Sequence, residues 1–184
     1  MCVVIRMNRD LAEADCMNTV FEQYKALNID GKLISLEQIE KVNQYFCYPT
    51  NAKAIGFEGC IMYCFIEGYG EMVFASNPET CADVYVYPLA KNFTDFLRLI
   101  LACGSANPVE QIVWMGKEQF DQHLKNEQAI RTDVQNEVLQ QLRIKLGILP
   151  IEKPYEYVKE LQKDFDNSKI EYSDEYYDIL GIER

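Results

Sequence analysis

Cysteine and histidine are the residues of this chain whose chemistry is easiest to recognise from spacing. There are seven cysteines and a single histidine, His123. The cysteines are scattered, odd in number and contain no Cys-x-x-Cys pair, so neither a zinc site nor a disulfide framework is predicted. We expect them to be reduced, buried and packed as small hydrophobic side chains, as in a cytoplasmic protein. Their positions are Cys2, Cys16, Cys47, Cys60, Cys64, Cys81 and Cys103.

The candidates for acid–base chemistry are equally sparse. His123 follows Asp121 by two residues in EQFDQHLKN, and residues two apart on a helix do not face each other, so they are not a base with its orienting carboxylate. Glu67 and Glu71 flank the sequence GYG, but acids beside a turn are usually solvated, whereas a general acid must be desolvated. GYG also lacks the glycine spacing and the lysine of a phosphate-binding loop. We therefore predict no catalytic residue, no cofactor and no metal site.

Composition and charge narrow the class of protein. The chain of 184 residues is 48% hydrophobic and 26% charged, which is typical of a globular protein and not of a disordered one. Its net charge of −11 disfavours nucleic acid as a partner, because phosphate binding requires clustered Lys and Arg. An acidic surface suits either simple solubility or a basic protein partner.

The chain has no predicted membrane segment. The N-terminal apolar run in MCVVIRMNRD is too short for the core of a signal peptide. No later run approaches the roughly 18 apolar residues of a membrane-spanning helix. We expect a soluble, cytoplasmic protein, and the sequence leaves its oligomeric state open.

The first half of the chain predicts an α+β core over residues 1–104. Asn92 is a good N-cap and Gly104 a good terminator for the helix between them, whose apolar residues cover most of its circumference. Pro88 is expected to stop the strand before this helix. The predicted sheet is twisted and antiparallel, with helices packed on one side. The expected elements are helices over 10–27 (capped by Asp10) and 35–46 (capped by Ser35), a loop over 47–58, a hairpin over 60–77, a strand over 82–89 and a helix over 93–103.

The sequence of the second half, residues 105–184, predicts a mostly helical extension. We expect it to pack on the core, so that the chain forms one compact domain. The pattern of VEQIVWM, residues 109–115, indicates a short strand. Pro154 is typical of the first turn of a helix. The remaining expected helices cover residues 117–126, 134–147 and 154–165.

Acidic residues and tyrosines alternate near the C-terminal end. Residues 148–184 contain ten acids and five bases, a net charge of −5. Interleaved tyrosines and carboxylates could contact a basic protein. Alternatively, the tyrosines dock this segment onto the body while the acids face water. The candidate partner-binding residues are Glu67, Tyr69 and Glu71 at the hairpin tip, and Tyr172, Asp174, Glu175, Tyr176 and Tyr177 near the C-terminal end.

The block DVYVYPLAKNFTDFLRLIL, preceded by CIMYCFIEGYGEMVFASN, resembles the C-terminal half of the SUKH superfamily. Members of this family place a last sheet strand before a helix with an F-x-x-F-L start, and Phe93, Phe96 and Leu97 match that pattern. The similarity covers residues 10–103 in the order of elements and residues 60–103 in pattern. It implies the same α+β fold, and it carries over no catalytic residues because the family shares none.

The resemblance implies a non-enzymatic role. Bacterial members are immunity proteins that bind and neutralise toxins of competing strains, many of them nucleases. The expected partner is therefore a protein, with a basic toxin as the candidate that the family suggests. A regulatory or scaffold protein in a larger assembly, similar to the fungal cell-wall synthesis regulators of the family, is the alternative. A small cysteine- or carboxylate-dependent enzyme is the third class.

Overall fold

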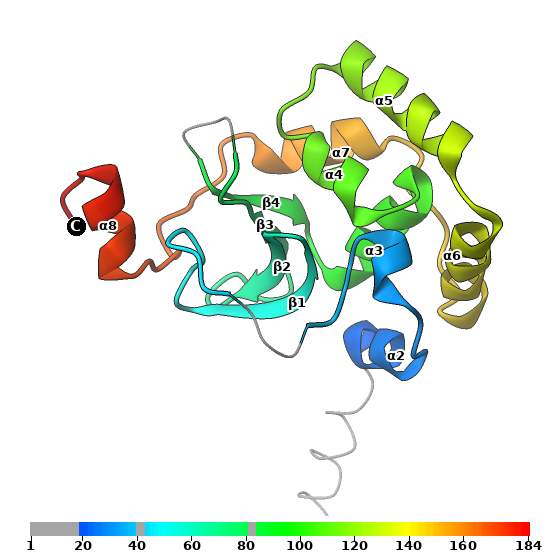
Figure 1. The fold of residues 1–184 in the computed structure, drawn as a ribbon, viewed down its shortest axis with the longest axis horizontal. Helices are drawn as coiled ribbons and strands as arrows, with labels where there is room; N and C mark the ends of the chain where they lie inside the picture. Colours follow the sequence, from blue (N-terminus) through cyan, green and yellow to red (C-terminus); the bar gives the residue numbers. More distant parts are fainter. Residues whose placement is uncertain (1–18, 40–42, 81–83) are drawn as a thin grey trace, which may run out of the picture.

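A four-stranded antiparallel sheet forms the centre of the molecule (Figure 1). The computed structural model describes residues 19–39, 43–80 and 84–184. Each strand pairs with the next along the chain, so the sheet is a simple meander in the order β1-β2-β3-β4. The strands are β1 (Ala52–Glu58), β2 (Ile61–Ile66), β3 (Val73–Ser76) and β4 (Val86–Ala90). The expected α+β fold, with helices packed on the sheet, is confirmed.

Most helices lie on the same side of this sheet, and the last one lies apart at the opposite end of the molecule (Figure 1). The expected helices in the second half are present, with some differences in their bounds. The helical elements are α2 (Val20–Ala26), the 3-10 helix η2 (Gly31–Ile34), α3 (Phe93–Cys103), α4 (Ala106–Gln111), α5 (Lys117–Ile130), α6 (Asp133–Lys145), α7 (Pro154–Gln162) and α8 (Asp174–Leu180).

The strict alternation of side chains along β2 divides the interior into two apolar clusters. Ile61, Tyr63 and Phe65 point to the side covered by the helices, which we call the helix face. Met62, Cys64 and Ile66 alternate with them and point to the opposite side. That side is covered by the chain around Phe46–Tyr48 and by the segment after α7, so we call it the tail face, and residues 164–184 the tail.

The helix face holds the larger cluster, and α3 is its central helix. Asn92 caps this helix, since its Oδ1 accepts a hydrogen bond from the Asp95 backbone N–H at 2.8 Å, as predicted. Gly104 ends the helix in the left-handed conformation, with φ of 98°, which favours glycine. The extension contributes Phe120, Leu142 and Val158 to the same cluster, so the two halves of the chain share one core.

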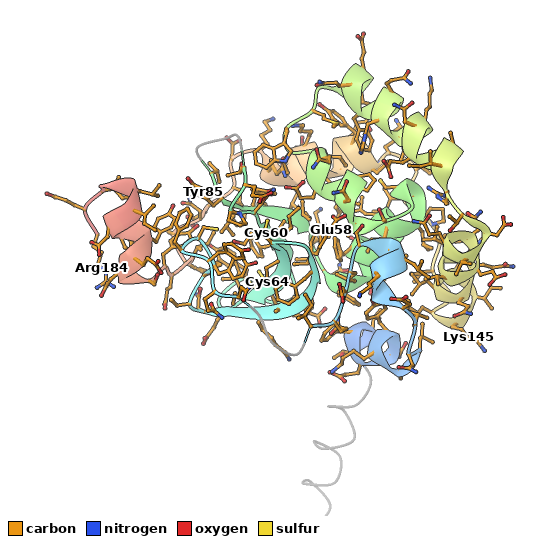
Figure 2. All side chains as sticks on the ribbon, in the orientation of Figure 1. Glu58, Cys60, Cys64, Tyr85, Lys145 and Arg184 are labelled. Carbon is orange, nitrogen blue, oxygen red and sulfur yellow. The ribbon has the colours of Figure 1, made fainter. Side chains whose placement is uncertain are left out.

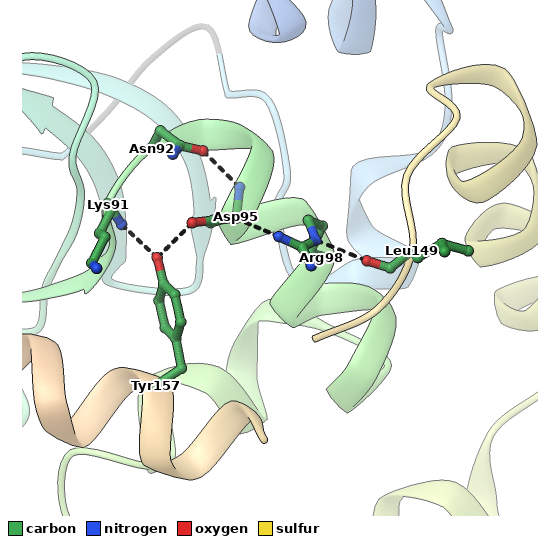
Figure 3. Close-up of polar contacts among 6 residues, drawn as sticks. All are labelled: Lys91, Asn92, Asp95, Arg98, Leu149 and Tyr157. Carbon is green, nitrogen blue, oxygen red and sulfur yellow. Dashed lines mark hydrogen bonds and ion pairs between the residues drawn. The ribbon is translucent and has the colours of Figure 1, made fainter. Parts of the chain in front are cut away.

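A polar junction fastens the start of α3 to α7 and to the loop before α7 (Figure 3). The Tyr157 hydroxyl donates to Asp95 Oδ2 at 2.8 Å and accepts from the Lys91 backbone N–H at 3.0 Å. Arg98 donates to the same carboxylate, at 2.9 Å from Oδ1, and to the Leu149 carbonyl at 3.0 Å. Asp95 thus joins the start of α3 directly to α7 and, through Arg98, to the loop before α7.

The predicted helix over 35–46 is wrong in the part that the structure describes. Ser35 has a left-handed backbone (φ of 54°) after η2, and Glu37 forms a β-bridge with Phe57 through two backbone hydrogen bonds of 2.9 Å. Leu36 is fully buried against Gly56, where a Cβ would lie 2.4 Å from its Cδ1. Tertiary packing against the edge of β1 therefore overrides the helical pattern.

Other boundaries also differ from expectation. The predicted cap Asp10 lies outside the described residues, and α2 begins at Val20 after the N-cap Thr19. The segment expected to be a loop over 47–58 contains β1. Pro88 does not stop its strand: it pairs with Phe74 within β4, which tolerates proline because it is an edge strand.

The predicted strand over 109–115 is also wrong, because this segment continues from α4 through helical turns. Ala106, Val109 and Ile112 are all buried at a spacing of three, which suits a helical face. The structure also buries Glu110, a charged residue, on the same helix.

Candidate partner-binding surface

Glu110 is the most deeply buried acidic group that the structure describes, with no solvent exposure. Its Oε1 accepts hydrogen bonds from Asn77 Nδ2 at 2.9 Å, from Trp114 Nε1 at 3.1 Å and from the Tyr87 hydroxyl. Its Oε2 accepts from Gln111 Nε2 at 2.8 Å. Four neutral donors therefore satisfy this carboxylate, which lets it remain buried without a cation.

Glu58 lies at the end of β1 in the same polar region. Burial raises its pKa, against the opposing effect of hydrogen bonds from Asn107 and Ser35; the Ser35 hydroxyl donates to Oε1 at 2.9 Å. Burial and the nearby carboxylates also raise the pKa of Tyr63 well above its ordinary value. A carboxyl with a raised pKa has one property of a general acid.

The main surface hollows of the described residues lie away from this region. Four surface hollows stand out among the described residues, and none is lined by Glu58, Glu110 or His123. The described residues also hold no group of three His, Cys, Asp or Glu side chains that could bind a metal. The arrangement of Glu58 and Glu110 is therefore best explained as a structural polar network.

The cysteines that the structure describes are also poorly suited to nucleophilic chemistry. Cys47, Cys64 and Cys103 are buried, and burial raises the pKa of Cys103 to about 12. Cys60 lies in the turn between β1 and β2, not within the strand, and burial raises its pKa too. A raised pKa disfavours the thiolate that a cysteine nucleophile requires.

The two predicted contact regions, the hairpin tip and the tail, are brought together by Tyr69. Its hydroxyl donates to the Asp166 carbonyl and accepts from the Lys169 backbone N–H, both at 3.0 Å. The Lys169 ammonium in turn donates to the Gly68 carbonyl at 3.0 Å. The turn between β2 and β3 is therefore a fixed attachment point for the tail, and the two regions form one surface.

A second attachment lies one step further along the tail, at the residues before β1. Asn51 donates through Nδ2 to the Lys169 carbonyl at 2.9 Å and accepts from the Glu171 N–H at 3.2 Å. The Thr50 N–H donates to the Glu171 carbonyl at 2.8 Å. These bonds hold the tail against the residues that precede β1.

Aromatic rings complete the attachment. Tyr172 and Tyr176 stack with their centroids 3.8 Å apart and an interplanar angle of 8°. Tyr176 also packs against Phe46 and Tyr85, at 6.2 and 6.3 Å. Tyr69, Tyr172 and Tyr176 thus dock the tail onto the body, which is the second of the two interpretations that the sequence allowed for the tyrosines.

The remaining predicted residues lie on the outer side of this surface. Glu67, Glu71, Asp174 and Glu175 are exposed, and Tyr177 is half-buried with one edge against Tyr176. The tail contains seven acids and two bases. Of the five ion pairs among the described residues, only the pair between Arg184 and Asp174 lies in the tail. Most of its carboxylates are therefore available to an external cation.

Two hollows open beside the tail. The larger, of about 600 Å³, is lined on its polar side by Asp174, Tyr177 and Arg184. The other, of about 420 Å³, includes Tyr45, Tyr48 and Glu175. Both hollows reach Thr50 and Ser173. Each combines aromatic rings with a carboxylate, a combination that suits cationic side chains.

Sequence reasoning missed the residues on the body that receive the tail. Phe46, Thr50 and Asn51 were assigned to a helix and a loop, with no suggestion that they contact residues more than a hundred positions away. The one available signal was the aromatic run YFCYP at 45–49, since exposed loops seldom carry so many large apolar side chains.

Comparisons with protein-family models, with curated proteins and with solved structures found no match to this chain. Within the described ranges, no helix has both the length and the apolar character needed to cross a membrane. The proposals below therefore rest on the geometry of the molecule and on the resemblance in its sequence.

Proposed function

We propose that this protein is a non-enzymatic binding module that captures a basic protein partner through its acidic end, as SUKH-type immunity proteins capture toxins. The acidic end comprises the β2–β3 turn and the tail. The observation that carries the proposal is the junction at Tyr69, which joins two acidic segments about 100 residues apart in the sequence into one surface.

The charge distribution supports this choice of partner. Glu67, Glu71 and Glu175 are exposed and lie on the joined surface, whereas Lys169 is directed onto the Gly68 carbonyl and the Tyr69 ring. Complementary charge accelerates association and excludes acidic partners. The half-buried tyrosines add apolar contact area with little entropy cost, as they do at many protein interfaces.

Capture would act by occlusion. The attachments at Asp166, Lys169 and Glu171 hold the backbone of the tail on the body, so a basic partner would not have to order that segment on binding. A bound partner would lose access to its own anionic substrate wherever its basic site contacts this surface. No chemical step by this protein is required.

The proposal can be tested by affinity capture with a pair of matched variants. The first, Glu67→Lys with Glu175→Lys, reverses charge at both parts of the acidic end. The control, Glu118→Lys with Glu137→Lys, makes the same change in net charge at exposed positions of α5 and α6. Each tagged chain is incubated with lysates of the source organism and of competing strains, and retained proteins are quantified by mass spectrometry.

We expect a basic protein to be retained in stoichiometric amount by the native chain and the control, and to be lost from the acidic-end variant. Origin of the partner in a competing strain would favour immunity, and origin in the source organism would favour a regulatory or scaffold role. Equal retention by both variants would contradict the proposed surface. Retention of no basic protein from any lysate would contradict the proposed function.

A further inference from the structure

We infer that Asp174 and Tyr177 form a binding site for an arginine side chain of the partner, and that Arg184 of this chain occupies the site until the partner displaces it. The inference rests on the proposed function and specifies which residue of a basic partner would be its anchor. It also predicts that this protein limits its own affinity.

The position of Arg184 shows how such a site would work. Its guanidinium pairs with the Asp174 carboxylate and lies over the Tyr177 ring, with Cζ 5.6 Å from the ring centroid. A planar guanidinium can pair with a carboxylate and stack on an aromatic face at the same time, so this pair of residues suits arginine better than lysine. The internal arginine is thus a direct example of the ligand that these two residues accept.

The contact is arranged so that it can be exchanged. The side chains of Arg184 and Asp174 are 66% and 77% exposed. Exposed ion pairs contribute little to stability, so the energetic cost of releasing Arg184 is small. The hollow beside the pair measures about 600 Å³, which leaves room for an incoming side chain next to the resident one.

The surroundings favour a cation over any other occupant. Glu171 and Tyr172 line the same hollow, and Arg184 is the only basic residue among its described lining residues. Tyr172 is itself fixed by its stack on Tyr176, so one wall of the hollow is rigid. Removing Arg184 would leave an acidic, aromatic recess with no positive charge in its lining.

A peptide titration tests this directly on the full chain. The probe is an acetylated and amidated Arg-Gly-Arg-Gly-Arg peptide, with matched peptides in which citrulline or lysine replaces every arginine. Binding is followed by amide chemical shifts at low ionic strength. The variants are Arg184→Ala, Asp174→Asn, Tyr177→Leu and the control Lys145→Ala, which removes the same charge from α6, far from Arg184 (Figure 2).

We expect the arginine peptide to shift amides of residues 172–177 and to bind Arg184→Ala about threefold more tightly than Lys145→Ala, because the internal competitor is absent. Asp174→Asn and Tyr177→Leu should each weaken binding by a similar factor. The citrulline peptide should not bind. Damage to α8 would weaken binding in both variants. Tighter binding by Arg184→Ala together with weaker binding by Asp174→Asn would therefore identify competition by Arg184.

Four results would overturn the inference. Equal affinities for Arg184→Ala and Lys145→Ala would exclude competition by Arg184. Equal binding of the lysine and arginine peptides would exclude an arginine-specific site. Shifts confined to the β2–β3 turn would place the anchor elsewhere on the acidic end and leave the proposed function intact, whereas no shifts on the acidic end at all would contradict both proposals.

Discussion

The helix face and the tail face of the sheet are built on the same strands but differ in what covers them. The helix face is closed by several helices and contains large apolar side chains that are wholly buried, such as Phe96 and Leu97. The tail face is closed by the chain around Phe46–Tyr48 and by the tail, to which α8 contributes Tyr176, and it is held by hydrogen bonds and aromatic rings. We infer from this difference that the helix face contributes most of the stability of the fold, whereas the tail face holds the tail on the surface.

The largest effect should come from a cavity on the helix face. Phe96 is fully buried between Tyr63 and Phe93, so Phe96→Ala should lower the free energy of unfolding by about 4 kcal/mol. Phe46→Ala, which removes a half-buried ring from the tail face, should cost about 1 to 2 kcal/mol because the tail can collapse into the space. Urea denaturation measures the free energy of unfolding of both variants, and equal losses would contradict the proposed difference between the two faces.

The next largest loss of stability is expected from removing the buried carboxylate of Glu110. Glu110→Ala should destabilise the protein by about 3 kcal/mol, because Asn77, Tyr87 and Trp114 would each lose their acceptor in a buried environment. Glu110→Gln keeps the size and one acceptor oxygen, and should cost clearly less. Thermal unfolding by calorimetry gives both values, and a larger loss for Gln than for Ala would refute this account of the network.

A smaller and local effect is expected at the tail attachment. Tyr69→Phe removes one hydroxyl that serves both Asp166 and Lys169, so it should weaken the attachment by about 1 kcal/mol. Hydrogen exchange should then accelerate about fivefold at the Glu171 amide and remain unchanged in α3. Tyr177→Phe is the control, and uniform acceleration across the chain would show that the tail does not open independently.

The smallest effect is a dependence on pH. The raised pKa of Glu58 means that the folded state favours the protonated carboxyl. The protonated carboxyl therefore contributes its full stability below the ordinary pKa of 4.5, and this contribution is lost as the pH rises through the pKa of the folded state. Glu58→Gln should therefore be more stable than the native chain near neutral pH and similar to it in acid. A constant difference at every pH would exclude this cause.

The fold could be predicted where local signals and packing agree. The cap at Asn92, the apolar residues of α3 and the terminator Gly104 act within one helix, and all three were predicted correctly. The helix expected at 35–46 failed because Leu36 packs against β1 and the Gln38 side chain donates a hydrogen bond to the Ile55 carbonyl of the same strand. Such contacts join segments about 20 residues apart and leave no local pattern.

The candidate surface was predictable in composition but not in arrangement. The alternation of tyrosines and acids identified the tail, and the turn residues identified the hairpin tip. Nothing in the sequence indicates that Tyr69 binds the tail backbone at Asp166 and Lys169, because backbone carbonyls and amides carry no sequence signal. The pairing of Arg184 with Asp174 was missed for a related reason, since exposed charges have many possible partners.

The environment of Trp114 gives the helix face its own optical signal. This residue is the only tryptophan of the chain, and its indole donates to Glu110 and packs edge-on against Tyr87, with the ring centroids 5.0 Å apart. Light absorbed by indole alone therefore reports on the helix face and not on the tail, which contains no tryptophan. Indole fluorescence can thus show, in an unlabelled sample, whether the core stays folded when the tail is released.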